Sequence, residues 1–205
     1  IDDIQDLDIA ESIFTDKQYD LLCSRYGGYW RYPHLLDFCY LVNPYFPNQR
    51  LKDELAASFE RLLTEYPSGQ KVNNLLAAKD FGVKQEYILV GNGAAELIKA
   101  LTSQMLGKVG IVRPTFEEYP NRLMPEQVVA YVPQRPDFRY MVDDLMDYFD
   151  DKQIWSLVLI NPDNPTGNYI PYDDCLRLAQ WCQEREIVLV IDESFIDFSS
   201  EHPTF

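Results

Sequence analysis

The residues best suited to chemistry stand directly after two apolar runs. The run 155–160 leads into Asn161-Pro162-Asp163-Asn164-Pro165-Thr166-Gly167, and the run 187–191 leads into Asp192-Glu193-Ser194-Phe195. An amide side chain donates and accepts hydrogen bonds, whereas a carboxylate accepts them and stabilises a positive charge beside it. The two motifs therefore offer an amide and an acid, provided that the fold brings them together.

The elements that must position these motifs form one unit. Both apolar runs are typical of buried parallel strands, and the segment 172–185 between them has helix character. Two parallel strands joined by a helix make a βαβ unit, whose functional edge lies at the carboxyl ends of its strands. We therefore predict an α/β fold with the site at that edge.

The composition narrows the class of partner. The chain has 205 residues and is 46% hydrophobic, which is enough for a globular core. It carries 33 acidic against 18 basic residues, and this net charge of −15 argues against nucleic acid and anionic membrane as partners. Four cysteines without a C-x-x-C pair favour a reduced, cytoplasmic setting, and two histidines offer little for a metal site. Cys175 and Cys182 fall in the predicted helix, where buried thiols are expected.

A loop of small residues precedes these motifs. A predicted strand, 87–90, leads into Gly91-Asn92-Gly93-Ala94-Ala95, and a helix is predicted to start near Ala94. Small residues let the backbone approach a ligand, and the first turn of a helix offers free N–H groups to a phosphate. A dinucleotide site needs a third glycine where Glu96 stands, and a Walker loop needs Gly-Lys-Ser/Thr, so neither fits. The alternative interpretation of this segment is a tight strand-to-helix turn that binds no ligand.

The order of the motifs resembles one family. N-P-x-N-P-T-G, followed by a strand ending in D-E-x-F and preceded by the glycine loop and Arg113-Pro114-Thr115-Phe116, is similar to the pyridoxal-phosphate enzymes of the aspartate-aminotransferase fold. The resemblance runs from about Pro44 to Phe205. It implies a three-layer α-β-α domain with a mostly parallel sheet, present here as an incomplete large domain. It also implies pyridoxal 5'-phosphate as the cofactor and no metal.

The resemblance gives each motif a role. Asp192 would face the pyridine nitrogen, Asn164 would donate to the phenolate oxygen, and Phe116 would stack on the ring. The cofactor phosphate would bind the residues of the glycine loop that open the helix, namely Gly93, Ala94 and Ala95.

Two residues nearer the N-terminus match the family as well. Tyr66, in Tyr66-Pro67, would lend its phenol to the cofactor phosphate of the neighbouring subunit, which implies a homodimer. Asn43-Pro44 matches the arm that lines the substrate entrance in histidinol-phosphate aminotransferase and threonine-phosphate decarboxylase. The resemblance implies a small-molecule amino acid or a phosphorylated amino compound as substrate.

The chain departs from the family pattern in two ways. Phe195 stands where most of these aminotransferases have a tyrosine that also reaches the phenolate oxygen, and the segment 192–198 is closer to the threonine-phosphate decarboxylase branch. All eight lysines precede Asp192, whereas the family's Schiff-base lysine follows that motif. We therefore expect the catalytic lysine to be absent from this chain, and the chain to be a truncated piece that is inactive alone.

The chain divides into three expected segments. Residues 1–15 resemble the closing segment of sugar-phosphate and choline-phosphate nucleotidyltransferases, with Asp2 at the place of a metal-binding acid, and so would be a remnant or linker from an upstream domain. The start of a short acidic helix is the alternative. Residues 16–50 would form an N-terminal arm, and residues 51–205 a partial cofactor-binding domain. Further elements are predicted as helices at 51–65, at 72–83 and within 135–151, and as strands at 108–112 and 128–132.

Three functions stay open on the sequence. The first is a biosynthetic aminotransferase that moves an amino group between an amino acid and a keto acid or aldehyde. The second is a decarboxylase of a phosphorylated amino acid, whose product an upstream nucleotidyltransferase could use. The third is a lysine-less domain of the same fold that binds without catalysis.

Overall fold

The computed structural model describes residues 36, 43, 45–199 and 204. The chain divides into two units after Pro67, and the described residues of the second unit begin at Ser68. The expected remnant at 1–15 and most of the expected arm at 16–50 lie outside the described residues.

The described part of the first unit contains two consecutive helices where one was predicted. Helix α3 spans Gln49–Ala57 and helix α4 spans Phe59–Thr64, so the prediction of a single helix over 51–65 was wrong. The break falls at Ser58, whose N–H group bonds to the carbonyl oxygens of Glu54 and Leu55 and closes α3. Serine is less favourable inside a helix because its hydroxyl can form hydrogen bonds with nearby backbone groups in non-helical conformations. It is therefore more frequent at helix ends.

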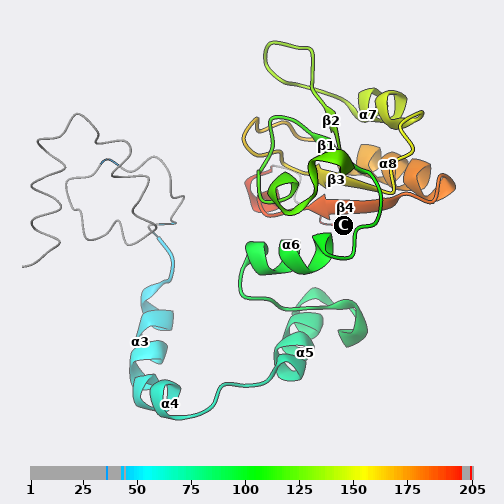
Figure 1. The fold of residues 1–205 in the computed structure, drawn as a ribbon. Helices are drawn as coiled ribbons and strands as arrows, with labels where there is room; N and C mark the ends of the chain where they lie inside the picture. The colour runs from blue at the N-terminus through cyan, green and yellow to red at the C-terminus, as the bar shows by residue number, and fades with distance from the viewer. Residues whose placement is uncertain (1–35, 37–42, 44, 200–203, 205) are drawn as a thin grey trace, which may run out of the picture. The chain divides into compact units, whose positions relative to one another are not determined.

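The second unit is built on a four-stranded parallel sheet. The strands are β1 (Val109–Val112), β2 (Val128–Tyr131), β3 (Ser156–Ile160) and β4 (Val188–Asp192), in the order β2-β1-β3-β4 (Figure 1). All three strand pairs are parallel, which confirms the predicted α/β fold.

Both faces of the central strand β3 are buried. Leu157 and Leu159 belong to one hydrophobic cluster, whereas Val158 and Ile160 belong to another. Because successive side chains of a strand point to opposite faces, the two clusters lie on opposite sides of the sheet. With one hydrophobic cluster on each face, the sheet is the middle layer of three, as predicted.

Different helices cover the two faces. The first cluster includes residues of α7 (Val142–Phe149) and α8 (Tyr172–Glu184), while the second includes Ile98 of α6 (Ala94–Thr102). Helices on both faces explain why β3 is an unbroken apolar run rather than an alternating one.

The segment before the glycine loop is not a strand. Helix α5 (Gln70–Phe81) is followed by a short 3₁₀ helix, η2 (Gln85–Tyr87), and residues 88–90 join no sheet, so the predicted strand at 87–90 was wrong. Side chains of α5 take the place of a strand partner. Asn74 accepts the Val90 N–H through Oδ1 at 3.0 Å, and the Gln70 amide donates to the Val90 carbonyl oxygen.

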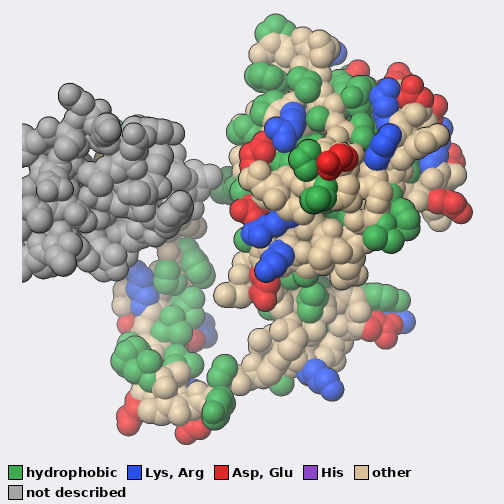
Figure 2. Space-filling model, viewed as in Figure 1, with side chains coloured by type: hydrophobic (Ala, Val, Ile, Leu, Met, Phe, Trp, Pro, Cys, Tyr) green, Lys and Arg blue, Asp and Glu red, His purple; other side chains and the backbone are tan. Residues whose placement is uncertain are grey.

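Several helices leave large hydrophobic side chains exposed. On α3 and α4 these are Leu55, Phe59, Leu62 and Leu63, and Figure 2 shows hydrophobic side chains at the surface of this part of the chain. On α5 they are Val72, Leu75, Leu76 and Phe81. Three more short 3₁₀ helices complete the described structure: η3 (Pro120–Arg122), η4 (Pro125–Gln127) and η5 (Ile196–Phe198).

Candidate active site

The two polar motifs meet at one edge of the sheet. Ile160, the last residue of β3, is in register with Asp192, the last residue of β4. The Asn161 N–H donates to the Asp192 carbonyl oxygen at 2.9 Å, which continues the ladder by one bond. Strand β1 runs parallel to them, so its carboxyl end, which leads into Arg113, lies at the same edge.

The Asp192 carboxylate is held by donors on both of its oxygens. Oδ1 accepts from the Ser194 N–H at 3.0 Å and from the Ser194 hydroxyl at 2.5 Å, and Oδ2 accepts from the Tyr119 hydroxyl at 2.9 Å. Asp192 itself is half-buried. Each carboxylate oxygen has two lone pairs, so Oδ1 is filled by its two donors, whereas Oδ2 keeps one lone pair for a ligand.

Tyr119 is the site residue to which the sequence analysis assigned no role. Its side chain is 4% exposed and packs in the cluster that contains Ile98 and Leu123. Burial, reinforced by the negative charge of Asp192, raises the pKa of Tyr119 above its ordinary value, so the hydroxyl keeps its proton and remains a donor. The only signal in the sequence was its position three residues after Phe116.

The two asparagines of N-P-x-N-P differ in their hydrogen bonds. Asn161 is 4% exposed, and its side chain both donates to the Ile170 carbonyl oxygen and accepts the Ile170 N–H, each at 2.9 Å. Asn164 is half-buried, and its side chain forms no hydrogen bond within the described residues. Asn161 therefore holds the loop closed, while the Asn164 amide is available to a ligand.

A second set of bonds shapes the turn that presents Asn164. The Asp163 carbonyl oxygen accepts the Gly167 N–H at 2.8 Å, and the Asp163 N–H donates to the Asn168 carbonyl oxygen at 2.8 Å. The Thr166 hydroxyl donates to the Asp163 carboxylate. Burial raises the pKa of Asp163 although this hydroxyl opposes the shift.

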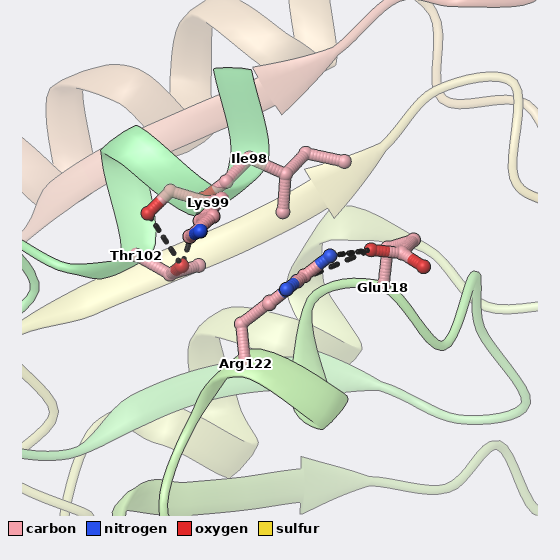
Figure 3. A network of polar contacts seen from close by, with 5 residues as sticks. All are labelled: Ile98, Lys99, Thr102, Glu118 and Arg122. Atoms are coloured by element: carbon pink, nitrogen blue, oxygen red, sulfur yellow. Dashed lines mark hydrogen bonds and ion pairs between the residues drawn. The ribbon is translucent and has the colours of Figure 1, made fainter. Parts of the chain in front are cut away.

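The aromatic candidate Phe116 stands between strand β1 and Tyr119. It is half-buried and packs against the cluster on the α6 face of the sheet. The next turn is fixed by an ion pair between Glu118 and Arg122 at 3.1 Å; Figure 3 shows this pair together with Thr102 of α6, whose hydroxyl bonds to the Ile98 and Lys99 carbonyl oxygens. Stacking of Phe116 on a cofactor ring stays a prediction.

The glycine loop opens helix α6 as predicted. A Cβ on Gly91 would lie 2.6 Å from Cδ2 of Leu97, so only glycine fits there without movement of that side chain. Gly93 has a φ of 85°, which side chains rarely adopt, and no heavy atom lies within 4 Å of its ideal Cβ position. Glu96 accepts the Asn92 N–H at 2.5 Å. The exposed first turn, at Ala94 and Ala95, presents N–H groups that lack partners within the helix.

The structure gives the surroundings of three other expected site residues, Phe195, Asn43 and Tyr66, but does not test their roles. Phe195 is half-buried, and its ring centroid lies 6.1 Å from that of Phe198. Asn43 and Tyr66 belong to the first unit. Asn43 accepts the Tyr45 N–H at 2.9 Å, and Tyr66 is fully exposed. Their roles at a substrate entrance and at a neighbouring subunit stay predictions.

The comparisons with known proteins identify the family. The model of the family described as "Aminotransferase class I and II" matches residues 38–205. The chain therefore belongs to the class I and II aminotransferase family. Its members depend on pyridoxal phosphate, use amino-acid substrates and are generally dimeric.

Similar proteins include more than one kind of enzyme. The chain is 34% identical over 201 residues to CMP-5'-(3-aminopropyl)phosphonate synthase of Streptomyces rubellomurinus, covering 97% of this chain and 32% of that protein. It is 34% identical to L-serine phosphate decarboxylase of Sulfurospirillum multivorans (81% and 44% covered). It is 32% identical to histidinol-phosphate aminotransferase 1 of Arabidopsis thaliana (77% and 37% covered).

A solved structure confirms the fold. The histidinol-phosphate aminotransferase of Clostridium acetobutylicum superposes with a TM-score of 0.68 at 24% identity, over 82% of this chain and 51% of that one. The chain spans less than half the length of each of the three sequence relatives above.

The residues present fit pyridoxal phosphate. Asp192 would offer a carboxylate to the ring nitrogen, and Asn164 would offer an amide that forms no hydrogen bond within the described residues. The start of α6 has no side chain at Gly91 or Gly93 that would block a phosphate. Within the described part of the chain, no helix could cross a membrane, and no group of three or more metal-ligating side chains gathers there.

Proposed function

We propose that the full protein is a pyridoxal-phosphate-dependent decarboxylase of an amino acid that carries a phosphate or phosphonate group. The observation that carries this proposal is Phe195 in D-E-S-F, the departure that resembles the decarboxylase branch. The 34% identity to an L-serine phosphate decarboxylase supports it.

The residues of this chain would hold the cofactor and set its protonation. When bound, pyridoxal phosphate withdraws electrons from the substrate bond that breaks. Asp192 would hold a proton on the ring nitrogen, because a carboxylate favours the charged form of a base beside it. Asn164 would donate to the phenolate oxygen, and the loop at Gly93 would bind the phosphate through backbone N–H groups. With Phe195 in place of tyrosine, Asn164 has no phenol beside it to share this donation.

We further propose that a nucleotidyl transfer follows the decarboxylation. The relative named CMP-5'-(3-aminopropyl)phosphonate synthase matches 97% of this chain, whereas the family model starts only at residue 38, so the likeness to that relative reaches into residues before 38. The resemblance of residues 1–15 to the end of a nucleotidyltransferase is consistent with this. The amine product would keep its phosphate or phosphonate, which is the group that a cytidylyl donor modifies.

The test uses the full-length protein with phosphoserine and phosphothreonine. We expect carbon dioxide release that requires pyridoxal phosphate and no 2-oxo acid, and we expect Asp192→Asn to reduce it about 100-fold or more. Added CTP should then transfer its CMP group to the phosphate or phosphonate oxygen of the amine product, with release of pyrophosphate. If no carbon dioxide is released from these two substrates or from their phosphonate analogues, decarboxylation is wrong.

Transamination is the second candidate. The family itself and the 32% identity to a histidinol-phosphate aminotransferase favour it. The same experiment separates the two, because an aminotransferase would consume 2-oxoglutarate and form glutamate without releasing carbon dioxide. A protein that binds the cofactor but does neither would support the third alternative, binding without catalysis.

A cytoplasmic homodimer with shared sites completes the proposal. Fully exposed Tyr66 would reach the cofactor phosphate of the neighbouring subunit. Mixing a Tyr66→Phe variant with an Asp192→Asn variant of the full protein tests this, because mixed dimers would contain one site with both residues intact. Recovery of part of the activity is expected; no recovery would place both residues in the same subunit's site.

A further inference from the structure

A hydrogen bond between two distant segments fixes one oxygen of Asp192. The Tyr119 hydroxyl donates to Oδ2 at 2.9 Å, across 73 residues of sequence. The other oxygen, Oδ1, is held within the Asp192 loop by the N–H and hydroxyl of Ser194. The donors to Oδ1 therefore come from Ser194, two residues after Asp192, and the donor to Oδ2 comes from the segment that follows β1.

The position of the Tyr119 hydroxyl is set by its surroundings. The ring is 4% exposed in the cluster with Ile98 and Leu123, and Tyr119 directly precedes η3. The Glu118–Arg122 ion pair spans this same turn (Figure 3). A hydroxyl on a packed ring cannot follow the carboxylate if it rotates, so the bond restrains the carboxylate rather than the reverse.

We infer that Tyr119 is a positioning residue for Asp192: its hydroxyl fixes the rotation of the carboxylate so that a remaining lone pair meets the ring nitrogen of the bound cofactor. This inference rests on the proposed role of Asp192. A carboxylate whose two oxygens accept from donors in two different loops has one orientation, and a charge-assisted hydrogen bond to the nitrogen depends strongly on that orientation.

The chain offers a matched control for removal of this hydroxyl. Tyr148 on α7 is half-buried, and its hydroxyl donates to the Ala130 carbonyl oxygen at 2.7 Å. It belongs to the partly buried residues around the cluster on the other face of the sheet, away from the Tyr119 cluster. Tyr148→Phe therefore removes a comparable hydrogen bond without touching Asp192.

The experiment measures the nitrogen-15 chemical shift of ring-labelled pyridoxal phosphate bound to the full protein, together with its dissociation constant. We expect Tyr119→Phe to move the nitrogen signal and to weaken binding about tenfold, the effect of one charge-assisted hydrogen bond. Tyr148→Phe should change neither. In the Asp192→Asn background, Tyr119→Phe should have no further effect on either quantity.

Each outcome separates the inference from the proposal beneath it. If Asp192→Asn moves the nitrogen signal and Tyr119→Phe leaves it unchanged, the role of Tyr119 is overturned and that of Asp192 stands. If Asp192→Asn also leaves the signal unchanged, Asp192 does not face the nitrogen and both fail. Circular dichroism of each variant shows whether a loss of binding reflects unfolding. Tyr119→Phe keeps the ring that packs in the cluster and removes only the hydroxyl, and the nitrogen signal of the cofactor that remains bound reports on folded molecules alone.

Discussion

The Asn161 N–H donates to the Asp192 carbonyl oxygen at 2.9 Å, so the first residue after strand β3 is tied to the last residue of β4. This bond places the start of N-P-x-N-P-T-G beside the start of D-E-S-F. The two motifs that stand 31 residues apart in the chain thus begin at adjacent points of one sheet edge.

The two asparagines of the first motif should behave oppositely when truncated. Asn161→Ala removes both buried bonds to Ile170 and leaves that backbone unsatisfied, so we expect a loss of about 2–4 kcal/mol in the free energy of unfolding. Asn164→Ala removes no hydrogen bond within the described residues, and we expect a change below about 0.5 kcal/mol together with weaker cofactor binding. Urea unfolding and cofactor titration of both variants measure the difference; equal losses of stability would contradict the division of roles.

A side chain at Gly93, which precedes α6, should lower the stability of the fold through backbone strain, since the space around its Cβ position is open. Gly93 and Gly69 both precede a helix in open space, but φ is 85° at Gly93 and −73° at Gly69. We expect Gly93→Ala to cost about 1–2 kcal/mol of stability and Gly69→Ala well under about 1 kcal/mol. Thermal unfolding of the two alanine variants checks this. A Gly69→Ala variant as unstable as Gly93→Ala would show that φ is not the cause.

The α7 face of the sheet should depend on Leu145. This side chain is fully buried, and Leu145→Ala should lower the free energy of unfolding by about 2–5 kcal/mol because a cavity remains. Leu176 on α8 is 39% exposed and serves as the control, with an expected loss below about 1 kcal/mol. Similar losses in both variants, measured in urea, would mean that this face is not closely packed.

Alkaline pH should destabilise the second unit through its buried thiols. Burial raises the pKa of Cys182 from 9.0 to about 12 and that of Cys175 to about 11. The unfolded thiols ionise above pH 9 while the native ones keep their protons, so this contribution to stability is complete below pH 9 and is lost as pH rises toward 12. Urea midpoints at pH 8 and pH 10 should show a smaller drop for Cys182→Ala than for the unchanged chain. An equal drop would assign the effect to other groups.

Local sequence determined the elements with the strongest patterns. The apolar runs 155–160 and 187–191 became β3 and β4. Every residue of β3 is buried, as expected of a strand covered on both faces. The prediction of a buried strand was wrong for β4, which stands at the edge of the described sheet and is half-buried or exposed. The helix between them and the helix that starts at Ala94 also appear where they were predicted. Three of the motifs that pointed to the family stand at the ends of strands: Phe116 follows β1, N-P-x-N-P-T-G follows β3, and D-E-S-F begins at the last residue of β4.

Only the tertiary structure decided which side chains meet. Tyr119 reaches Asp192 across 73 residues, and no spacing in the sequence encodes a contact between two loops that different strands carry. The resemblance had already assigned Asn164 to the cofactor, but the structural role of Asn161 depended on its two hydrogen bonds to Ile170. Residues 88–90 have the composition of a strand but pair with none, because strand formation requires a partner and here the side chains of Gln70 and Asn74 bind the backbone of Val90.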